Sequence, residues 1–86
     1  MADRPVTHSR KDRLGNITAL GKPGEIWSPR LSADAIRDIE LGLHSYYVAW
    51  PEKWTAIRVV SGLGGKYLRT DRDGTARNNL DDLPDI

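Results

Sequence analysis

Aromatic and basic side chains on predicted strands are the residues of this sequence best suited to recognising another molecule. The candidate binding set comprises Trp27, Tyr47, Trp50, Trp54, Arg58, Lys66 and Arg69. Tryptophan and tyrosine combine an apolar ring with a polar group, which suits interfaces better than a dry interior. Exposed rings of this kind often dominate protein–protein interfaces. The set therefore favours a small binding module that engages a macromolecular partner, most simply a protein.

Nucleic acid is the main alternative partner for the same residues. Bases can stack on exposed rings while arginine and lysine hold the phosphates, as in proteins that bind RNA or single strands. Alternation along a strand, however, turns about half of such rings toward the core. The two tryptophans of "WPEKW", Trp50 and Trp54, stand at the ends of one turn and either clasp that turn or form an exposed tip.

The segment "TDRDG" resembles part of a calcium-binding loop but lacks the required ligands. With Gly74 at the sixth position, Asp71 and Asp73 occupy the third and fifth. The first and twelfth positions are then Arg69 and Leu80, where oxygen ligands are needed. We expect a β-turn here and no metal site.

The glycine-rich segment "SGLGGK", Ser61 to Lys66, could offer backbone N–H groups to a phosphate. A P-loop needs a longer spacing, a following serine or threonine and a helix, whereas Tyr67 and a strand pattern follow here. The segment therefore predicts a tight hairpin. A nucleotide or other small ligand is the weaker alternative, and no cofactor is expected.

Nothing in the sequence points to catalysis. The chain has no cysteine, which excludes a thiol nucleophile, disulfides and cysteine-ligated zinc. Its two histidines, His8 and His44, do not form a catalytic or metal-binding pattern with nearby residues. Most carboxylates lie beside arginines or near the C-terminus, as solvated charges do. We therefore expect a protein that is not an enzyme.

The local patterns predict a small α+β domain in the order β-β-α-β-β-β, with one short helix covering one face of an antiparallel sheet. The predicted strands are residues 6–10, 16–21, 44–50, 54–61 and 66–70, and the helix is Ala33 to Leu41. The last three strands are joined by short turns and should form a meander.

The helix has the clearest local signal. Ser32 stands where an N-cap is expected, and Gly42 suits the helix end. Ile36 and Ile39 recur at helical spacing, so this pattern directs Asp38 away from the core.

The C-terminal residues are too rich in apolar side chains for a disordered tail. Leu80 and Leu83 can be buried, while Asn78 and Asn79 can brace a turn through side-chain hydrogen bonds to the backbone. We expect an ordered strap that packs on the domain after the last strand.

Composition is consistent with one globular domain over residues 1–86, with residues 1–5 flexible. No run of 18 apolar residues and no secretory signal occurs. We expect a cytoplasmic protein without membrane contact. The formal net charge of +1 and a pI of about 8.1 differ from the strongly basic character of many nucleic-acid-binding proteins.

Several segments, in this order, resemble a known family of small bacterial proteins. They are "RKDRLGNITALG", "IELGLHSYYV" and "KYLRTDRDGTARNNLDDLP". The resemblance, to the domain-of-unknown-function family 3892, extends from about Val6 to Pro84. It implies a compact single domain and brings no known activity or catalytic residues. The small size suits a bacterial or phage accessory protein.

Overall fold

The computed structural model describes residues 2–70 and 79–86, and within them it confirms the expected α+β class. Before the helix lie β1 (Ala2–Pro5), β2 (His8–Lys11), β3 (Ile17–Gly21) and β4 (Arg30–Leu31). The helix α1 (Ser32–Glu40) is followed by β5 (His44–Ala49), β6 (Trp54–Ala56), β7 (Arg58–Gly62), β8 (Gly65–Arg69) and the 3₁₀ helix η1 (Asn79–Asp82).

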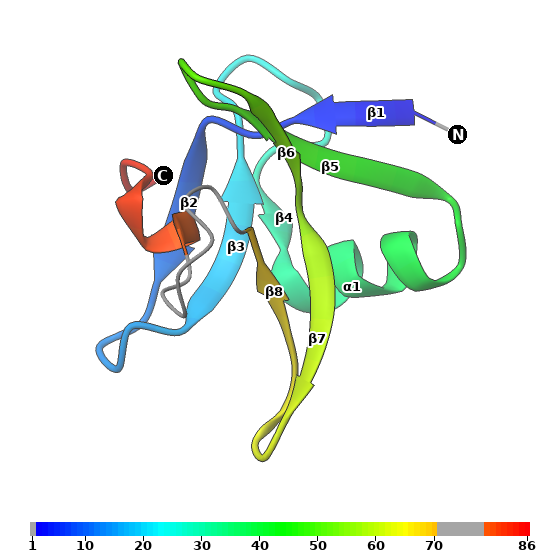
Figure 1. Cartoon of the computed structure of the whole chain (residues 1–86), viewed down its shortest axis with the longest axis vertical. Coiled ribbons are helices and arrows are strands. Elements are labelled where there is room, and N and C mark those ends of the chain that lie inside the picture. The colour runs from blue at the N-terminus through cyan, green and yellow to red at the C-terminus, as the bar shows by residue number, and fades with distance from the viewer. Residues whose placement is uncertain (1, 71–78) are drawn as a thin grey trace.

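The strands form three small sheets that share one core (Figure 1). The first sheet has the order β1-β5-β6, the second β2-β3-β4, and the third is the β7–β8 hairpin. Helix α1 packs against strands of all three, including β3, β5 and β8. The single helix therefore joins the sheets on their inner side.

The expected three-stranded meander is divided between two sheets. Residues 54–61, predicted as one strand, form β6 and β7 with Ile57 between them. Ile57 is buried, and its backbone N–H still donates to the carbonyl of Tyr46 at 2.8 Å. The chain thus leaves β5 at Ile57 and continues into a hairpin with β8.

The N-terminal residues, which we expected to be flexible, form strand β1. Residues 2–5 pair in parallel with β5, in a register that places Pro5 beside Tyr47. A parallel partner 42 residues away leaves no local pattern in the sequence, so this strand could not be predicted from periodicity.

Helix α1 begins one residue earlier than predicted. Its N-cap is Leu31, which makes no side-chain capping bond, so Ser32 is the first helical residue. Leu31 also pairs with Ala19 as part of β4, and the strand therefore runs directly into the helix. At the other end the helix stops at Glu40, one residue before the predicted Leu41. Gly42 terminates it as expected, with φ +69°. The N–H groups of Gly42 and Leu43 donate to the carbonyls of Ile39 and Asp38, respectively.

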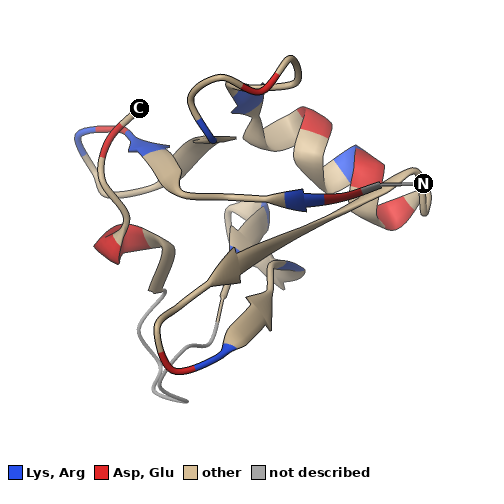
Figure 2. Cartoon of the chain, turned by 90° about the horizontal axis from the view of Figure 1, so that it is seen from above, with Lys and Arg blue, Asp and Glu red and all other residues tan. Residues whose placement is uncertain are grey.

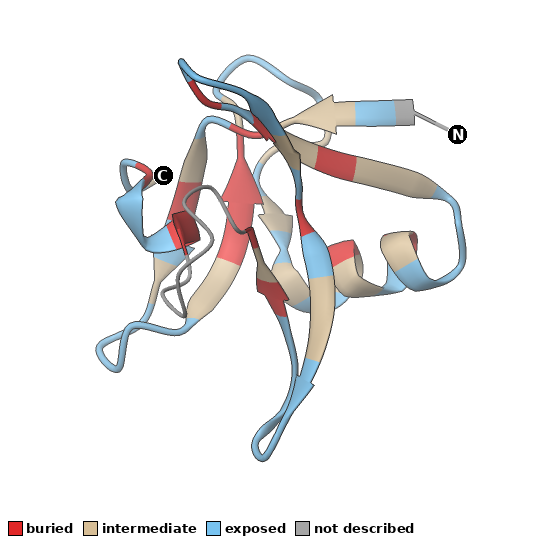
Figure 3. Cartoon of the chain, viewed as in Figure 1, coloured by how far each residue is buried: buried red, intermediate tan, exposed pale blue. Residues whose placement is uncertain are grey.

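The core lies between α1 and the inner faces of the sheets (Figure 3). Its buried members are Val6, Leu20, Ala35, Tyr46, Val48, Trp50, Ile57, Leu68, Leu80 and Leu83. Every sheet contributes to this set, as do α1 and the C-terminal residues. Such a distributed core makes each small sheet depend on the others.

The C-terminal strap is ordered where the structure describes it, in residues 79–86. Leu80 is fully buried and Leu83 is nearly so. Ser9 on β2 holds the strap, because its Oγ donates to the Leu80 carbonyl at 2.7 Å and its N–H donates to the Pro84 carbonyl at 3.0 Å. Asn79 is buried and donates its backbone N–H to the Thr70 carbonyl, whereas Asn78 lies outside the described residues.

Truncating the strap's central side chain tests this packing. Leu80→Ala should lower the free energy of unfolding by about 2–5 kcal/mol, because it opens a cavity in the core. Leu63→Ala, at the fully exposed tip of the β7–β8 hairpin, should change it by less than about 0.5 kcal/mol. Chemical denaturation measures both. Equal effects of the two substitutions would show that the strap is not part of the core.

Candidate binding surfaces

A buried carboxylate joins four elements of the fold. Asp38 on α1 is 2 % exposed, and Arg30 on β4 binds both of its oxygens, with Nε and one terminal nitrogen each at 3.0 Å. The hydroxyl of Tyr46 on β5 donates to the same carboxylate at 2.6 Å. Arg4 on β1 donates to that hydroxyl at 2.8 Å and lies 3.7 Å from the carboxylate. We call Arg4, Arg30, Asp38 and Tyr46 the Asp38 network.

The network fixes the ionisation of its members. Burial raises the pKa of Asp38, but hydrogen bonds from Arg30 and Tyr46 outweigh burial and hold this pKa below its ordinary value. Burial, together with the hydrogen bond to Asp38, raises the pKa of Tyr46. Asp38 is therefore ionised and Tyr46 protonated at neutral pH, which is the pairing that the hydrogen bonds require.

The predicted outward direction of Asp38 is wrong. The buried face of α1 includes Ala35 and Asp38, three residues apart, with Ile36 and Ile39 partly buried on either side. The isoleucine spacing alone predicted that the buried face is centred on Ile36 and Ile39, and so excluded Asp38 from it. The available signal was Ala35, whose small side chain permits close packing and which lies three residues before Asp38 on the same face of the helix. The arginine partners of Asp38, however, are Arg4 and Arg30, which lie on other elements.

Trp27, one of the candidate binding residues, belongs to the surroundings of this network. Its ring meets the Tyr46 ring edge-on, with centroids 5.8 Å apart. The Arg4 guanidinium lies 5.6 Å from the centroids of both rings, within the range of a cation–π interaction. Since Trp27 packs against the core, it serves the interior more than an open surface.

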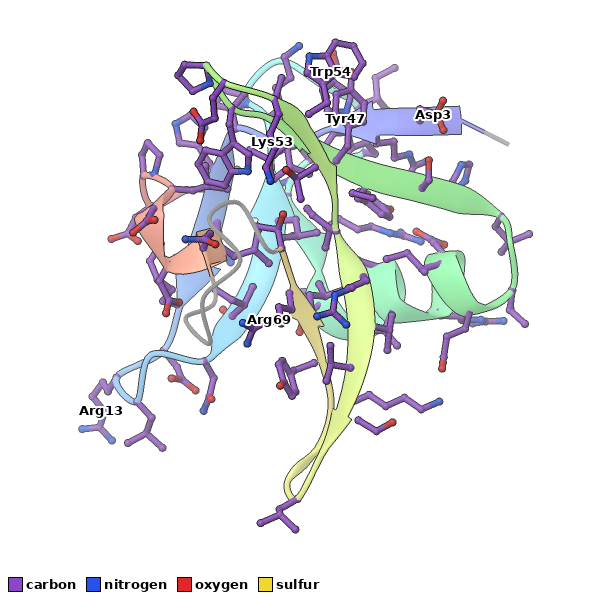
Figure 4. All side chains as sticks on the ribbon, viewed as in Figure 1. Asp3, Arg13, Tyr47, Lys53, Trp54 and Arg69 are labelled. Carbon is purple, nitrogen blue, oxygen red and sulfur yellow. The ribbon has the colours of Figure 1, made fainter. Side chains whose placement is uncertain are left out.

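Tyr47 and Trp54 form a stacked pair on the outer face of the β1-β5-β6 sheet. Their ring centroids are 4.7 Å apart and their planes differ by 13°. Trp54 is 73 % exposed and Tyr47 is partly exposed. Figure 4 shows both at the same end of the molecule, with Lys53 in the same region. We call Tyr47 and Trp54 the stacked pair.

The register of β5 and β6 explains why the rings can meet. Tyr47 pairs with Ala56 and Ala49 pairs with Trp54, so each ring stands opposite an alanine. Diagonal neighbours on one face of an antiparallel pair are within reach of aromatic side chains. The two small alanines leave space for the rings to cross between strands.

Trp50, another candidate, lies in the core instead. Tyr46, Val48 and Trp50 are buried, as the alternation along β5 and its continuation requires. The turn 50–54 therefore sends its two tryptophans in opposite directions: Trp50 supports the interior and Trp54 is presented to solvent.

The basic candidates do not join the stacked pair in one charged surface. Arg58 and Arg69 pair across the β7–β8 hairpin, and both already take part in interactions within the chain. Lys66, on the opposite face of that hairpin, forms an ion pair with Glu40 on α1 at 2.5 Å. Figure 2 shows basic and acidic residues interspersed along the described chain.

Two kinds of feature are absent from the described residues, a cluster of metal ligands and a helix that could span a membrane. In residues 2–70 and 79–86, no three histidine or carboxylate side chains gather as a metal site would require. The rejected calcium frame is centred on residues 71–74, outside the described part. Within that part, α1 is far too short and polar to cross a membrane, and no helix there is long and apolar enough to do so.

Replacing the buried carboxylate should destabilise the fold. Asp38→Asn should lower the free energy of unfolding at neutral pH by about 3 kcal/mol, because the arginines lose their buried partner. Asp34→Asn, in the first turn of the same helix, removes the same charge and should cost less than about 1 kcal/mol. Similar losses in the two variants would contradict a special role for Asp38.

The advantage of Asp38 over asparagine should also depend on pH. The folded-state pKa of Asp38 lies below its unfolded value, so the stabilisation is complete above the unfolded pKa and is lost as pH falls through the folded one. The free energies of unfolding of the wild type and Asp38→Asn, measured by denaturation from neutral pH to below about 4, should differ less as the pH falls. A constant difference across that range would contradict the ion-pair account.

Comparison with known proteins supplies a family but no relative of known activity. A family model described as "Protein of unknown function (DUF3892)" matches residues 6–84. No curated protein and no solved structure matches the chain. The match covers nearly the whole sequence, so the chain belongs to the DUF3892 family of proteins of unknown function.

Proposed function

We propose that this protein is a non-enzymatic binding module that engages a protein partner through the stacked pair, Tyr47 and Trp54. The observation that carries the proposal is the 73 % exposure of Trp54 on a regular strand, held in a fixed orientation by Tyr47. Large aromatic residues are enriched among the residues that contribute most to binding energy at protein interfaces.

The stacked pair is held in one arrangement without a partner, which favours binding. A free tryptophan side chain would lose rotamer freedom on association, at a cost of about 0.5–1.5 kcal/mol for each immobilised side chain. Stacking on Tyr47 reduces that cost, and the paired strands β5 and β6 hold both backbones in place. The protein maintains an exposed apolar ring that burial against a partner would stabilise.

A single-stranded nucleic acid or a nucleotide is the second candidate, because an exposed ring that follows a lysine in the sequence, Lys53, can also stack with a base. A protein partner is favoured over a nucleic acid because the basic candidates already interact within the chain: Lys66 is ion-paired, and Arg58 and Arg69 also have interactions of their own.

We further propose that the protein is a cytoplasmic accessory factor of bacterial or phage origin. Its small size and its lack of cysteine support this proposal.

Loss of the Trp54 ring should weaken partner binding by roughly 30-fold, the equivalent of about 2 kcal/mol for a dominant interface residue. Immobilised wild-type protein, Trp54→Ala and Leu41→Ala would be exposed to lysate of the source organism, and retained proteins identified by mass spectrometry. Leu41, 60 % exposed after α1, is the matched control. Binding measured with the recovered partner should fall only for Trp54→Ala; equal retention by all three proteins would contradict the proposal.

Tryptophan fluorescence separates the alternatives. Wild type and Trp54→Phe would be titrated with single-stranded RNA, duplex DNA and a mononucleotide at low and high salt. Quenching by RNA that requires Trp54 and weakens steeply with salt would favour nucleic acid over a protein partner. Saturation by the mononucleotide would contradict both macromolecular readings, whereas the protein proposal expects no specific quenching by any of these ligands.

A further inference from the structure

A second surface feature lies at the end of the molecule opposite the stacked pair. A groove of about 480 Å³ runs between the β2–β3 turn, residues 15–17, and the β7–β8 hairpin, residues 62–68. Ser32 at the start of α1 and Asp81 on η1 complete its lining. Figure 1 shows both turns projecting at the lower end, while Figure 4 places Tyr47 and Trp54 at the upper end. We call this feature the hairpin groove.

One side of the groove is formed by the ring of Tyr67, whose position depends on the absence of a side chain at Gly62. Tyr67 is 40 % exposed, and its ring lies across the hairpin beside Gly62. A Cβ atom at Gly62 would approach the Tyr67 ring to 3.1 Å, closer than most real contacts. The missing side chain therefore lets the ring lie close to the hairpin backbone.

The opposite edge of the groove is the β2–β3 turn, which is stabilised by hydrogen bonds to Asp12. The Asp12 carboxylate accepts backbone hydrogen bonds from Leu14 at 2.8 Å and from Asn16 at 3.0 Å. The bond from Asn16 is the main reason why the pKa of Asp12 lies below its ordinary value. Gly15 supplies the positive φ of +84° that the turn needs. Both edges thus have defined conformations.

Asp81 gives the groove its unbalanced charge. Lys66 and Asp81 are the charged residues of the described lining, and Lys66 is already paired with Glu40. Asp81 is exposed and makes no hydrogen bond or ion pair in the described part of the chain. Arg13, in the β2–β3 turn, is not part of the groove lining and points away from the body of the molecule (Figure 4). Among the described residues of the lining, Asp81 is therefore the charge that a cationic ligand would complement.

We propose that the hairpin groove binds an arginine side chain carried by an extended segment of a protein partner. A guanidinium group is planar, stacks on aromatic rings and can donate two parallel hydrogen bonds to one carboxylate. Tyr67 supplies the ring and Asp81 the carboxylate. The groove volume also exceeds that of one side chain, so neighbouring residues of the segment have room to enter.

The proposal is independent of the stacked pair. The two surfaces share no residue, so loss of binding at one leaves the other testable by its own variants. A partner large enough to reach both ends could use them together, and each contact would then raise the effective concentration of the other.

The direct test is a titration of ¹⁵N-labelled protein with acetyl-Gly-Arg-Gly-amide at millimolar concentrations, followed by amide chemical shifts. Shifts should concentrate in residues 15–17, 62–68 and 81. The same peptide with citrulline in place of arginine keeps the shape without the charge and should bind at least tenfold more weakly. N-acetyl-arginine amide, a free small molecule, should bind more weakly than the peptide.

Matched variants identify the residues responsible. Asp81→Asn should weaken the peptide about tenfold, and Tyr67→Leu should weaken it several-fold. Asp3→Asn removes the same charge at the other end of the molecule and should have no effect. Thermal unfolding of each variant verifies folding. Absence of shifts, equal binding of the citrulline peptide or of free arginine amide, or unchanged affinity in Asp81→Asn would overturn the proposal.

Discussion

The ionised carboxylate of Asp38 is the constraint on which the arrangement of this fold depends. Removing a carboxylate from water costs several kcal/mol, and the cost is offset only where its partners are well placed. Here the partners come from β4, β5 and β1, so Arg30, Tyr46 and Arg4 can satisfy Asp38 only when α1 sits correctly between two sheets. The interaction therefore specifies the assembly of elements that local propensities leave undetermined.

The position of the stacked pair follows from this arrangement. Tyr46 must face inward to donate to Asp38, and alternation along β5 then turns Tyr47 outward. The register between β5 and β6 brings Trp54 to the diagonal position, where an alanine opposite each ring leaves space for stacking. The internal ion pair and the exposed aromatic surface are thus opposite sides of one strand.

Local sequence signals predicted the elements whose cause is local. The isoleucine spacing and Gly42 predicted the helix to within one residue at each end. Alternation predicted that about half of the strand rings face the core, and the structure places Tyr46 and Trp50 inside and Tyr47 outside. Features that depend on distant partners could not be predicted in this way. Strand β1 exists through pairing with β5, and the break at Ile57 arises where the chain passes between sheets. Asp38 is buried because arginines on other elements neutralise it.

For the candidate site, residue types indicated aromatic recognition, but only the packing distinguished Trp54 from Trp50 and placed Lys66 in an ion pair.

The pKa of Asp38 itself tests the role of this carboxylate most directly. It can be measured from the carboxyl carbon chemical shift of ¹³C-labelled protein during an acid titration of the folded state. Paired with Arg30 and Tyr46, Asp38 should titrate below the ordinary aspartate value of about 3.9. A pKa at or above that value would mean that burial dominates over the partners. In that case the carboxylate would not be the interaction that joins α1 to the sheets.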